Sequence, residues 1–250
     1  MRLIADLRFA RRVLALLALL VVCVPLHFLW LAVLGTSPWP PRFLGLAARA
    51  CGTRARLVGR PLRRDVFFIS NHQSWLDILI LGGATRSAFI AKAELETARV
   101  VGWLASLNRT IYIRREDRRA MPEQIATVRA AILRGAVTIF PEGTTSDGTE
   151  LLPFKAGLLQ VLDPPPPGIR VQPIFLDYGS DAPGIGWSGN ESGLVNALRV
   201  MRRRGPVRVV VRCLEPFDPA GHGGRKGIAA EGRRRIAAAI AASGSAVRVI

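Results

Sequence analysis

Apolar residues form one long uncharged run near the start of the chain. Val13–Leu34 reads VLALLALLVVCVPLHFLWLAVL and contains no charged residue. A helix of this length rises about 33 Å, which is enough to cross a hydrocarbon core of roughly 30 Å. A second apolar stretch, Phe43–Ala50, follows shortly after it. The pattern predicts an N-terminal membrane-anchoring segment over residues 1–60 and a single further domain over residues 61–250.

The anchoring segment is compatible with two placements in a bilayer. Arginines both precede and follow the apolar run, so the distribution of positive charge favours neither orientation. Pro25 also permits a kinked helix that enters one leaflet and returns through 43–50, so a spanning and a one-leaflet anchor both stay open. The length of the run argues against a buried core helix. A signal peptide is disfavoured too, because GTSPWPP is a poor cleavage site.

Beyond Arg64 the pattern changes to short β-rich runs that alternate with helical periodicity. Several of the runs are apolar throughout, as expected of a sheet that is covered on both faces. The alternation predicts an α/β fold with a mostly parallel or mixed central sheet flanked by helices. The predicted strands are Val66–Ser70, Ser87–Ala91, Thr110–Arg114, Val137–Phe140, Val171–Tyr178 and Val207–Leu214. The predicted helices are Trp75–Leu81, Ala120–Arg134, Phe154–Leu162, Gly193–Arg204 and Ala229–Ala242.

The net charge of +17 implies an anionic partner such as a lipid surface, a nucleic acid or an acidic protein. Nucleic acid is disfavoured, because the chain has only two tyrosines and no recognition motif. An anionic membrane surface fits the apolar run better. Three cysteines give no disulfide framework, and with three histidines they form no zinc pattern, so we expect no metal site and a reducing compartment.

The segment NHQSWLD, Asn71–Asp77, follows a predicted strand and opens a predicted helix. His72 therefore lies at the carboxyl end of a strand, where open α/β sheets place their sites. Asp77 lies about one helical turn further on and can orient the imidazole, an arrangement that suits a general base. On its own, this spacing would more often be a helix-capping histidine beside a surface carboxylate.

A second polar turn follows the buried strand in TIFPEGTTSDG, Thr138–Gly148. Glu142 stands at the strand end, where it can bind a polar substrate. Gly143 allows a backbone N–H to approach a ligand closely, and the hydroxyls of Thr144 and Thr145 are further donors. An ordinary turn would have the same composition, so the motif gains its meaning beside the first one.

Together, NHxSxxD and FPEGT, about 65 residues apart, resemble the signature blocks of the glycerolipid acyltransferase family, of the bacterial 1-acyl-sn-glycerol-3-phosphate acyltransferase type. The resemblance covers roughly Asp65–Tyr178 and includes GWLASLNRTIYIRR and the VQPIF strand. It implies transfer of an acyl group from acyl-CoA or acyl carrier protein to a lysolipid hydroxyl, without a cofactor. It also implies a bacterial inner membrane location with the catalytic domain on the cytoplasmic side.

The same resemblance assigns roles to individual residues. His72 would be the base that deprotonates the acceptor hydroxyl, and Asp77 would be its orienting partner. The implied substrate-binding residues are Arg115, Glu142, Gly143, Thr144, Thr145, Lys92 and Pro173, of which Pro173 is linked to the acyl-donor side.

The sequence departs from the family pattern at Thr145, where phosphatidate-forming members often carry an arginine. Arginine binds phosphate bidentately, whereas threonine offers one neutral hydroxyl. The NRTIYIRRE, GWSG and VRCLEPF segments resemble lyso-ornithine lipid acyltransferases more loosely. Lysophosphatidic acid is the first choice of acceptor and lyso-ornithine lipid the second. A catalytically inactive membrane protein and a thioester hydrolase are the alternatives from other classes.

Overall fold

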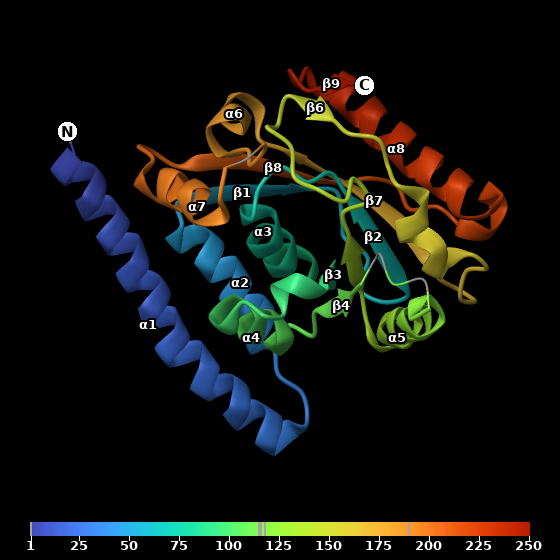
Figure 1. Cartoon of the computed structure of the whole chain (residues 1–250), viewed down its shortest axis with the longest axis horizontal. Coiled ribbons are helices and arrows are strands. Elements are labelled where there is room, and N and C mark those ends of the chain that lie inside the picture. Colours follow the sequence, from blue (N-terminus) through green and yellow to red (C-terminus); the bar gives the residue numbers. More distant parts are fainter. Residues whose placement is uncertain (1, 115–116, 118, 190) are drawn as a thin grey trace.

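The computed structural model describes residues 2–114, 117, 119–189 and 191–250, and its centre is a seven-stranded sheet in the order β1-β8-β7-β2-β5-β3-β4 (Figure 1). All neighbouring pairs are parallel except β7 and β8, so β1 and β8 run opposite to the other five strands. A small parallel pair, β6 (Glu150–Leu151) and β9 (Arg248–Val249), lies apart from it. The strands of the main sheet are β1 (Thr53–Val58), β2 (Val66–Ser70), β3 (Ala88–Lys92), β4 (Ile111–Ile113), β5 (Val137–Ile139), β7 (Arg170–Asp177) and β8 (Val207–Cys213).

Helices cover both faces of the sheet, with α2, α3 and α7 on one side and α5, η2 and α8 on the other (Figure 1). The arrangement confirms the predicted α/β fold class. The α-helices are α1 (Arg2–Leu34), α2 (Trp39–Ala50), α3 (Leu76–Thr85), α4 (Arg99–Leu107), α5 (Met121–Arg134), α6 (Ala182–Ile185), α7 (Gly193–Arg202) and α8 (Gly224–Ser243). The 3₁₀ helices are η1 (Ala93–Leu95), η2 (Ala156–Leu162), η3 (Gly179–Asp181) and η4 (Pro219–His222).

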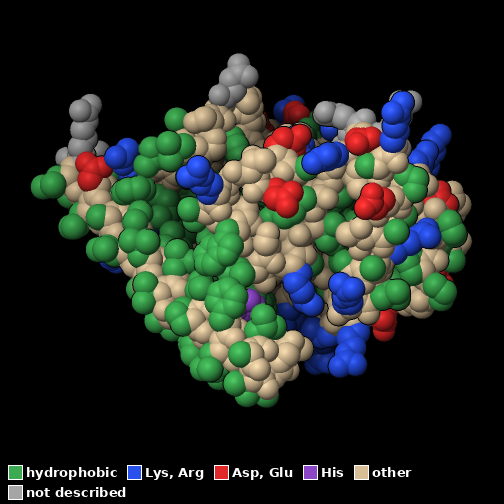
Figure 2. Space-filling model, turned by 60° about the horizontal axis from the view of Figure 1, so that its bottom comes forward, with side chains coloured by type: hydrophobic (Ala, Val, Ile, Leu, Met, Phe, Trp, Pro, Cys, Tyr) green, Lys and Arg blue, Asp and Glu red, His purple; other side chains and the backbone are tan. Residues whose placement is uncertain are grey.

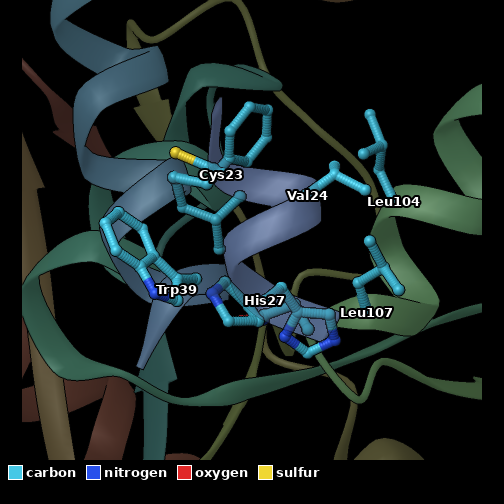
Figure 3. Close-up of a pocket in the computed structure, with 10 residues that line it drawn as sticks. Cys23, Val24, His27, Trp39, Leu104 and Leu107 are labelled. Atoms are coloured by element: carbon cyan, nitrogen blue, oxygen red, sulfur yellow. The ribbon is translucent and has the colours of Figure 1, made fainter. Parts of the chain in front are cut away.

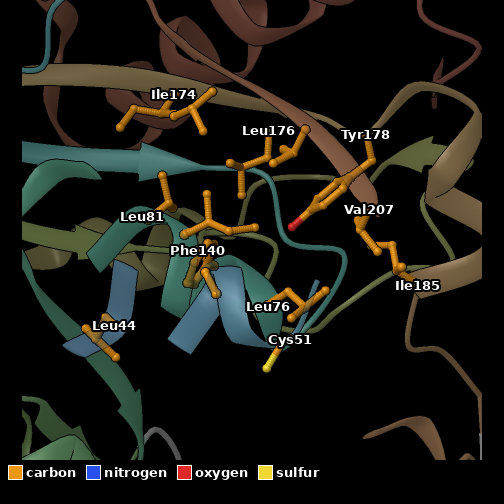
Figure 4. Close-up of a cluster of buried hydrophobic side chains, with 14 of the residues drawn as sticks. Leu44, Cys51, Leu76, Leu81, Phe140, Ile174, Leu176, Tyr178, Ile185 and Val207 are labelled. Atoms are coloured by element: carbon orange, nitrogen blue, oxygen red, sulfur yellow. The ribbon is translucent and has the colours of Figure 1, made fainter. Parts of the chain in front are cut away.

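The central strand β2 shows why a continuous apolar run becomes an interior strand. All five of its residues are buried. Successive side chains of a strand point to opposite faces, so Phe68 packs into the α2–α3 side while Phe67 and Ile69 pack into the α5–α8 side. Figure 4 shows the first of these clusters, in which Leu44 of α2 and Leu81 of α3 lie below the sheet.

Helix α1 extends away from the sheet along one side of the molecule (Figure 1). Its Leu3–Leu34 segment has a mean hydropathy of 2.6 over its most apolar window, of which 11% is buried. In the described part of the chain, this is the one helix long and apolar enough to cross a membrane. The first third of α1 contacts the domain, because the buried guanidinium of Arg12 donates to the carbonyls of Val200 and Met201 at the end of α7, both at 3.0 Å.

Helix α2 joins α1 to the rest of the fold. It packs closely against α3, since a Cβ added at Gly83 of α3 would lie 2.5 Å from the Cα of Gly45 in α2. The absence of side chains at both positions therefore lets the two helix backbones touch.

Several elements differ from the sequence-based expectation. Residues 53–58, which were predicted with the anchoring segment, form edge strand β1, and its alternating arginines are exposed. Residues 154–162 were predicted as a helix, whereas in the structure Ala156–Leu162 form the 3₁₀ helix η2. Helix α4 was not predicted, and α1 begins eleven residues before the apolar run, at Arg2 rather than Val13.

Candidate active site

His72 lies in the short loop between β2 and α3, at the carboxyl edge of the sheet. The preceding residue fixes the start of this loop. Asn71 is buried, and its side chain pairs with the backbone of Leu176 in β7, accepting from the N–H at 2.8 Å and donating to the carbonyl at 3.1 Å. The amide side chain thus continues the β2–β7 pairing for one more position and holds the loop in place.

The imidazole of His72 is oriented by the carboxylate of Asp77. His72 Nδ1 lies 2.8 Å from Asp77 Oδ2, the imidazole is 17% exposed, and the carboxylate is fully buried. The same oxygen accepts from the backbone N–H groups of Gln73 at 2.7 Å and Ser74 at 2.9 Å. An oxygen that already accepts from two N–H groups acts as an acceptor toward the imidazole as well. Nδ1 therefore carries the proton of the pair, and Nε2 is left as the basic nitrogen.

The second oxygen of Asp77 accepts from the hydroxyl of Tyr178 at 2.5 Å. Tyr178 follows the end of β7 and is buried. Its burial and the neighbouring Asp77 charge raise the pKa of the phenol well above its ordinary value, so the phenol is a neutral donor. The site thus contains a chain of three groups, Tyr178–Asp77–His72, of which the sequence predicted two.

The strand end of β5 forms the floor of the site. The ring of Phe140 stacks on the imidazole of His72 with centroids 3.9 Å apart and planes 15° apart. Glu142 is buried, and its Oε1 accepts from the backbone N–H of His72 at 3.1 Å. Burial raises the pKa of Glu142 to about 8, against a smaller lowering by the His72 N–H.

The turn after Glu142 wraps around the His72 loop. Ser146 donates its N–H to the carbonyl of His72 at 3.1 Å, so the two ends of the 142–146 turn both contact His72. Gly143 has a φ of +76°, which only glycine adopts without strain. Thr144 is exposed and Thr145 is half-buried. The predicted residues 142–145 are therefore brought beside His72.

The GWSG segment supports the same loops from outside. The backbone N–H of Trp187 is shared between the carbonyls of Gln73 at 3.0 Å and Ser146 at 3.1 Å. Its indole N–H donates to the carbonyl of Glu191 at 2.8 Å. Trp187 therefore joins the NHQSWLD and FPEGT loops, a role that the sequence did not reveal.

Two other predicted residues, Lys92 and Pro173, belong to neighbouring strands. Lys92 is exposed at the end of β3, which is separated from β2 by β5. Pro173 is buried within β7, opposite Ile69 of β2. Arg115 lies outside the described residues. Within the ranges that are described, no group of three or more His, Cys, Asp or Glu side chains could hold a metal ion.

Comparisons with known proteins indicate an acyltransferase family. A sequence model of the family described as "Acyltransferase" matches residues 55–177. A lyso-ornithine lipid O-acyltransferase of Brucella abortus is 30% identical over 255 residues, covering 94% of this chain and 94% of the relative. A 1-acyl-sn-glycerol-3-phosphate acyltransferase of Neisseria gonorrhoeae is 39% identical over 140 residues, or 54% of each chain.

A solved structure shares the fold. The crystal structure of the 1-acyl-sn-glycerophosphate acyltransferase PlsC from Thermotoga maritima matches with a TM-score of 0.63 and 22% identity. The match covers 95% of this chain and 98% of that one, so the similarity includes the N-terminal helices as well as the sheet.

Proposed function

Because this chain belongs to the family of acyltransferases that act on lysolipids, we propose that it transfers a fatty acyl group from an acyl thioester to the hydroxyl of lyso-ornithine lipid. The observation that carries the reaction type is the His72–Asp77 pair at 2.8 Å, with Nδ1 held by the carboxylate and Nε2 left basic. No nucleophilic side chain is required, since the acceptor lipid supplies its own hydroxyl.

The proposed reaction passes through a tetrahedral intermediate. Nε2 of His72 removes the proton of the acceptor hydroxyl as its oxygen attacks the thioester carbonyl, and Asp77 stabilises the imidazolium that forms. The tetrahedral intermediate then expels the thiolate, which takes up the proton from the imidazolium. A new ester bond has formed, and the carbon–sulfur bond has broken. General-base catalysis of this kind contributes about 10²–10⁴-fold to the rate.

The 142–146 turn supplies the groups that complete this reaction. We assign the hydroxyls of Thr144 and Thr145 to the developing oxyanion or to the acceptor, since donors placed there stabilise charge only as it forms. Glu142 and Gly143 bind the acceptor, and Lys92 and Arg115 its polar head. Pro173 contributes from the donor side through the packing of β7 beside β2.

Two observations support the ornithine-type acceptor. Thr145 provides a neutral hydroxyl where phosphate-binding relatives often have a cation, which weakens the case for a phosphate headgroup. The similarity to the Brucella lyso-ornithine lipid enzyme extends over 94% of the chain, whereas the similarity to the Neisseria enzyme stops at 54%. Lysophosphatidic acid is the second candidate, because the shorter match is the more identical one at 39%.

We place the enzyme on the bacterial inner membrane through α1 and α2, with the site on the cytoplasmic side where acyl-CoA and acyl carrier protein are found. Its long apolar helix and lipid-modifying relatives indicate membrane association. The catalytic domain then begins at β1, whose pairing with β8 makes it part of the sheet.

The test uses membranes that contain the wild type, His72→Ala or Thr145→Arg, each given a labelled acyl thioester and one lysolipid at a time. We expect acylation of lyso-ornithine lipid, a loss of about 10²–10⁴-fold in His72→Ala, and a shift toward lysophosphatidic acid in Thr145→Arg. Wild-type preference for lysophosphatidic acid would overturn the acceptor assignment. Full activity of His72→Ala in a folded, membrane-bound protein would overturn the mechanism.

A further inference from the structure

Helix α4 presents an apolar face to the outside although it belongs to the catalytic domain. Val100, Val101 and Trp103 have exposed fractions of 64%, 54% and 46%. Arg99 and Arg109, both exposed, stand at the two ends of this face, and no acidic residue lies between them. A short helix with an apolar face and cationic ends is typical of elements that lie in the interface of an anionic membrane.

The opposite face of α4 places it beside the middle of α1. Leu104 and Leu107 line a crevice whose other wall includes Cys23, Val24 and His27 of α1 (Figure 3). These α1 residues stand near the centre of the apolar run Val13–Leu34. If that run lies within one leaflet, α4 beside it lies in the interface of the same leaflet, and its outer face meets lipid rather than water.

The surface of the molecule has a matching distribution of side chains. Figure 2 shows hydrophobic side chains gathered over the left and lower part of one face, with Lys and Arg clustered at their border. Helix α1 also has exposed apolar side chains like those of α4, for example Val21 with an exposed fraction of 74%. An apolar area of this extent, rimmed by cations, is unfavourable in water and complementary to an anionic bilayer.

We propose that α4 inserts into the anionic bilayer as a second lipid-contacting element beside the anchor, an inference that rests on the proposed membrane attachment through α1. The crevice between them suits lipid oxygen atoms. Among the described residues, the buried ring nitrogens Nδ1 of His27 and Nε1 of Trp39 have no hydrogen-bond partner there. The indole nitrogen is a donor only, so an ester or phosphate oxygen of a lipid is its complement.

Insertion of α4 has a direct bearing on the reaction. The helix lies in the chain between β3, which ends at Lys92, and β4, which ends just before Arg114. Both residues are exposed. With α4 in the interface, the ends of these two strands lie at the level of the lipid headgroups, so a lysolipid can approach the site while its acyl chain stays in the bilayer.

The test measures lipid exposure at single positions of the full-length protein. Val101→Cys on α4, Val21→Cys on α1 and Leu133→Cys on α5 are labelled with a nitroxide in vesicles of phosphatidylglycerol and phosphatidylethanolamine. Leu133 is the matched control, with an exposed fraction of 73% on a helix remote from α1. Burial raises the pKa of Cys51 to about 12 and that of Cys213 to about 11, so these native thiols label slowly at neutral pH. Wild-type protein treated in the same way gives the background.

We expect the labels at 101 and 21 to be relaxed several-fold more by oxygen than by a water-soluble nickel chelate, and the label at 133 to show the reverse. Lipid exposure at 21 together with water exposure at 101 would overturn the insertion of α4 and leave the anchor intact. Water exposure at both would overturn the anchor as well. Shielding of position 101 from both reagents would overturn the insertion of α4 and indicate that a protein partner covers this helix. Acyl transfer by the same preparations reports separately on the proposed function.

Discussion

The hydroxyl of Tyr178 offers a single-atom perturbation of the proposed active site. Tyr178→Phe keeps the ring in its buried place and removes only the oxygen that donates to Asp77 at 2.5 Å. Among the described residues, no other group hydrogen-bonds that carboxylate oxygen. A hydrogen bond to a buried charge contributes about 1.5–3 kcal/mol. For a chain of 250 residues this corresponds to a fall in Tm of about 3–12 °C.

The same change should alter His72, the proposed base, through Asp77. Without the phenolic donor, more of the carboxylate charge is directed at the imidazolium of His72, which stabilises the protonated base. We therefore expect the acidic limb of the pH profile of kcat to move to higher pH. A looser carboxylate also positions the imidazole less well, and we expect kcat to fall about tenfold, equivalent to about 1.4 kcal/mol in the barrier.

The assay combines thermal unfolding with acyl transfer across a range of pH values. The chain offers one matched control, because its other tyrosine, Tyr112, donates to the carbonyl of Gly102 at 2.8 Å away from the site. Tyr112→Phe loses a hydrogen bond between neutral groups, worth about 1 kcal/mol, and should leave the pH profile unchanged. A Tyr178→Phe enzyme with wild-type Tm and an unshifted profile would refute the role given to the Tyr178–Asp77 bond.

Three further changes test other parts of the structure. The raised pKa of Glu142, about 8 against 4.5 for the ordinary group, means that the folded state holds the proton more tightly, so stability is lost as pH rises from 4.5 towards 8. Glu142→Gln should therefore flatten the fall of stability with pH, which is at most about 1.4 kcal/mol per pH unit. The measurement is the free energy of unfolding of wild type and variant at pH 5 and pH 8, and an equal change with pH in both proteins would contradict the role given to Glu142. Arg12→Ala should lower stability by about 2–4 kcal/mol and increase proteolysis where α1 contacts α7. Arg11 is an exposed neighbour, so Arg11→Ala should do neither. Gly83→Ala should cost about 1–3 kcal/mol by forcing α2 and α3 apart, and Gly157→Ala, where nothing lies within 4 Å, should be tolerated in the same thermal unfolding assay.

The sheet was predictable wherever local pattern and tertiary role agree. VFFIS is apolar at every position because β2 is covered on both faces, and the structure has it at the predicted residues, Val66–Ser70. Strand β1 was missed because the exposed arginines of an edge strand resemble a polar loop. Helix α4 was missed because its exposed apolar face removes the usual division between a buried apolar and an exposed polar side.

The candidate site also contains contacts that the sequence predicts and contacts that it does not. His72 and Asp77 are five residues apart, so a strand followed by a helix is sufficient to predict their contact. Tyr178 is 101 residues from Asp77 and reads in sequence as the end of a buried strand. Phe140 likewise reads as a core residue, and only the β2–β5 pairing places its ring on the imidazole. Contacts made by distant strands depend on register, which a single sequence does not reveal.

The contact between Gly45 and Gly83 has a consequence for how the enzyme is supplied with substrate. Helix α2 belongs to the part that we place in lipid, and α3 bears Asp77, so no flexible tether separates the membrane from the proposed catalytic residues. The site is held at one height above the bilayer and samples only lipids that diffuse laterally past it. At constant enzyme per vesicle, turnover should therefore follow the mole fraction of lysolipid among the membrane lipids and be indifferent to the volume of water around them.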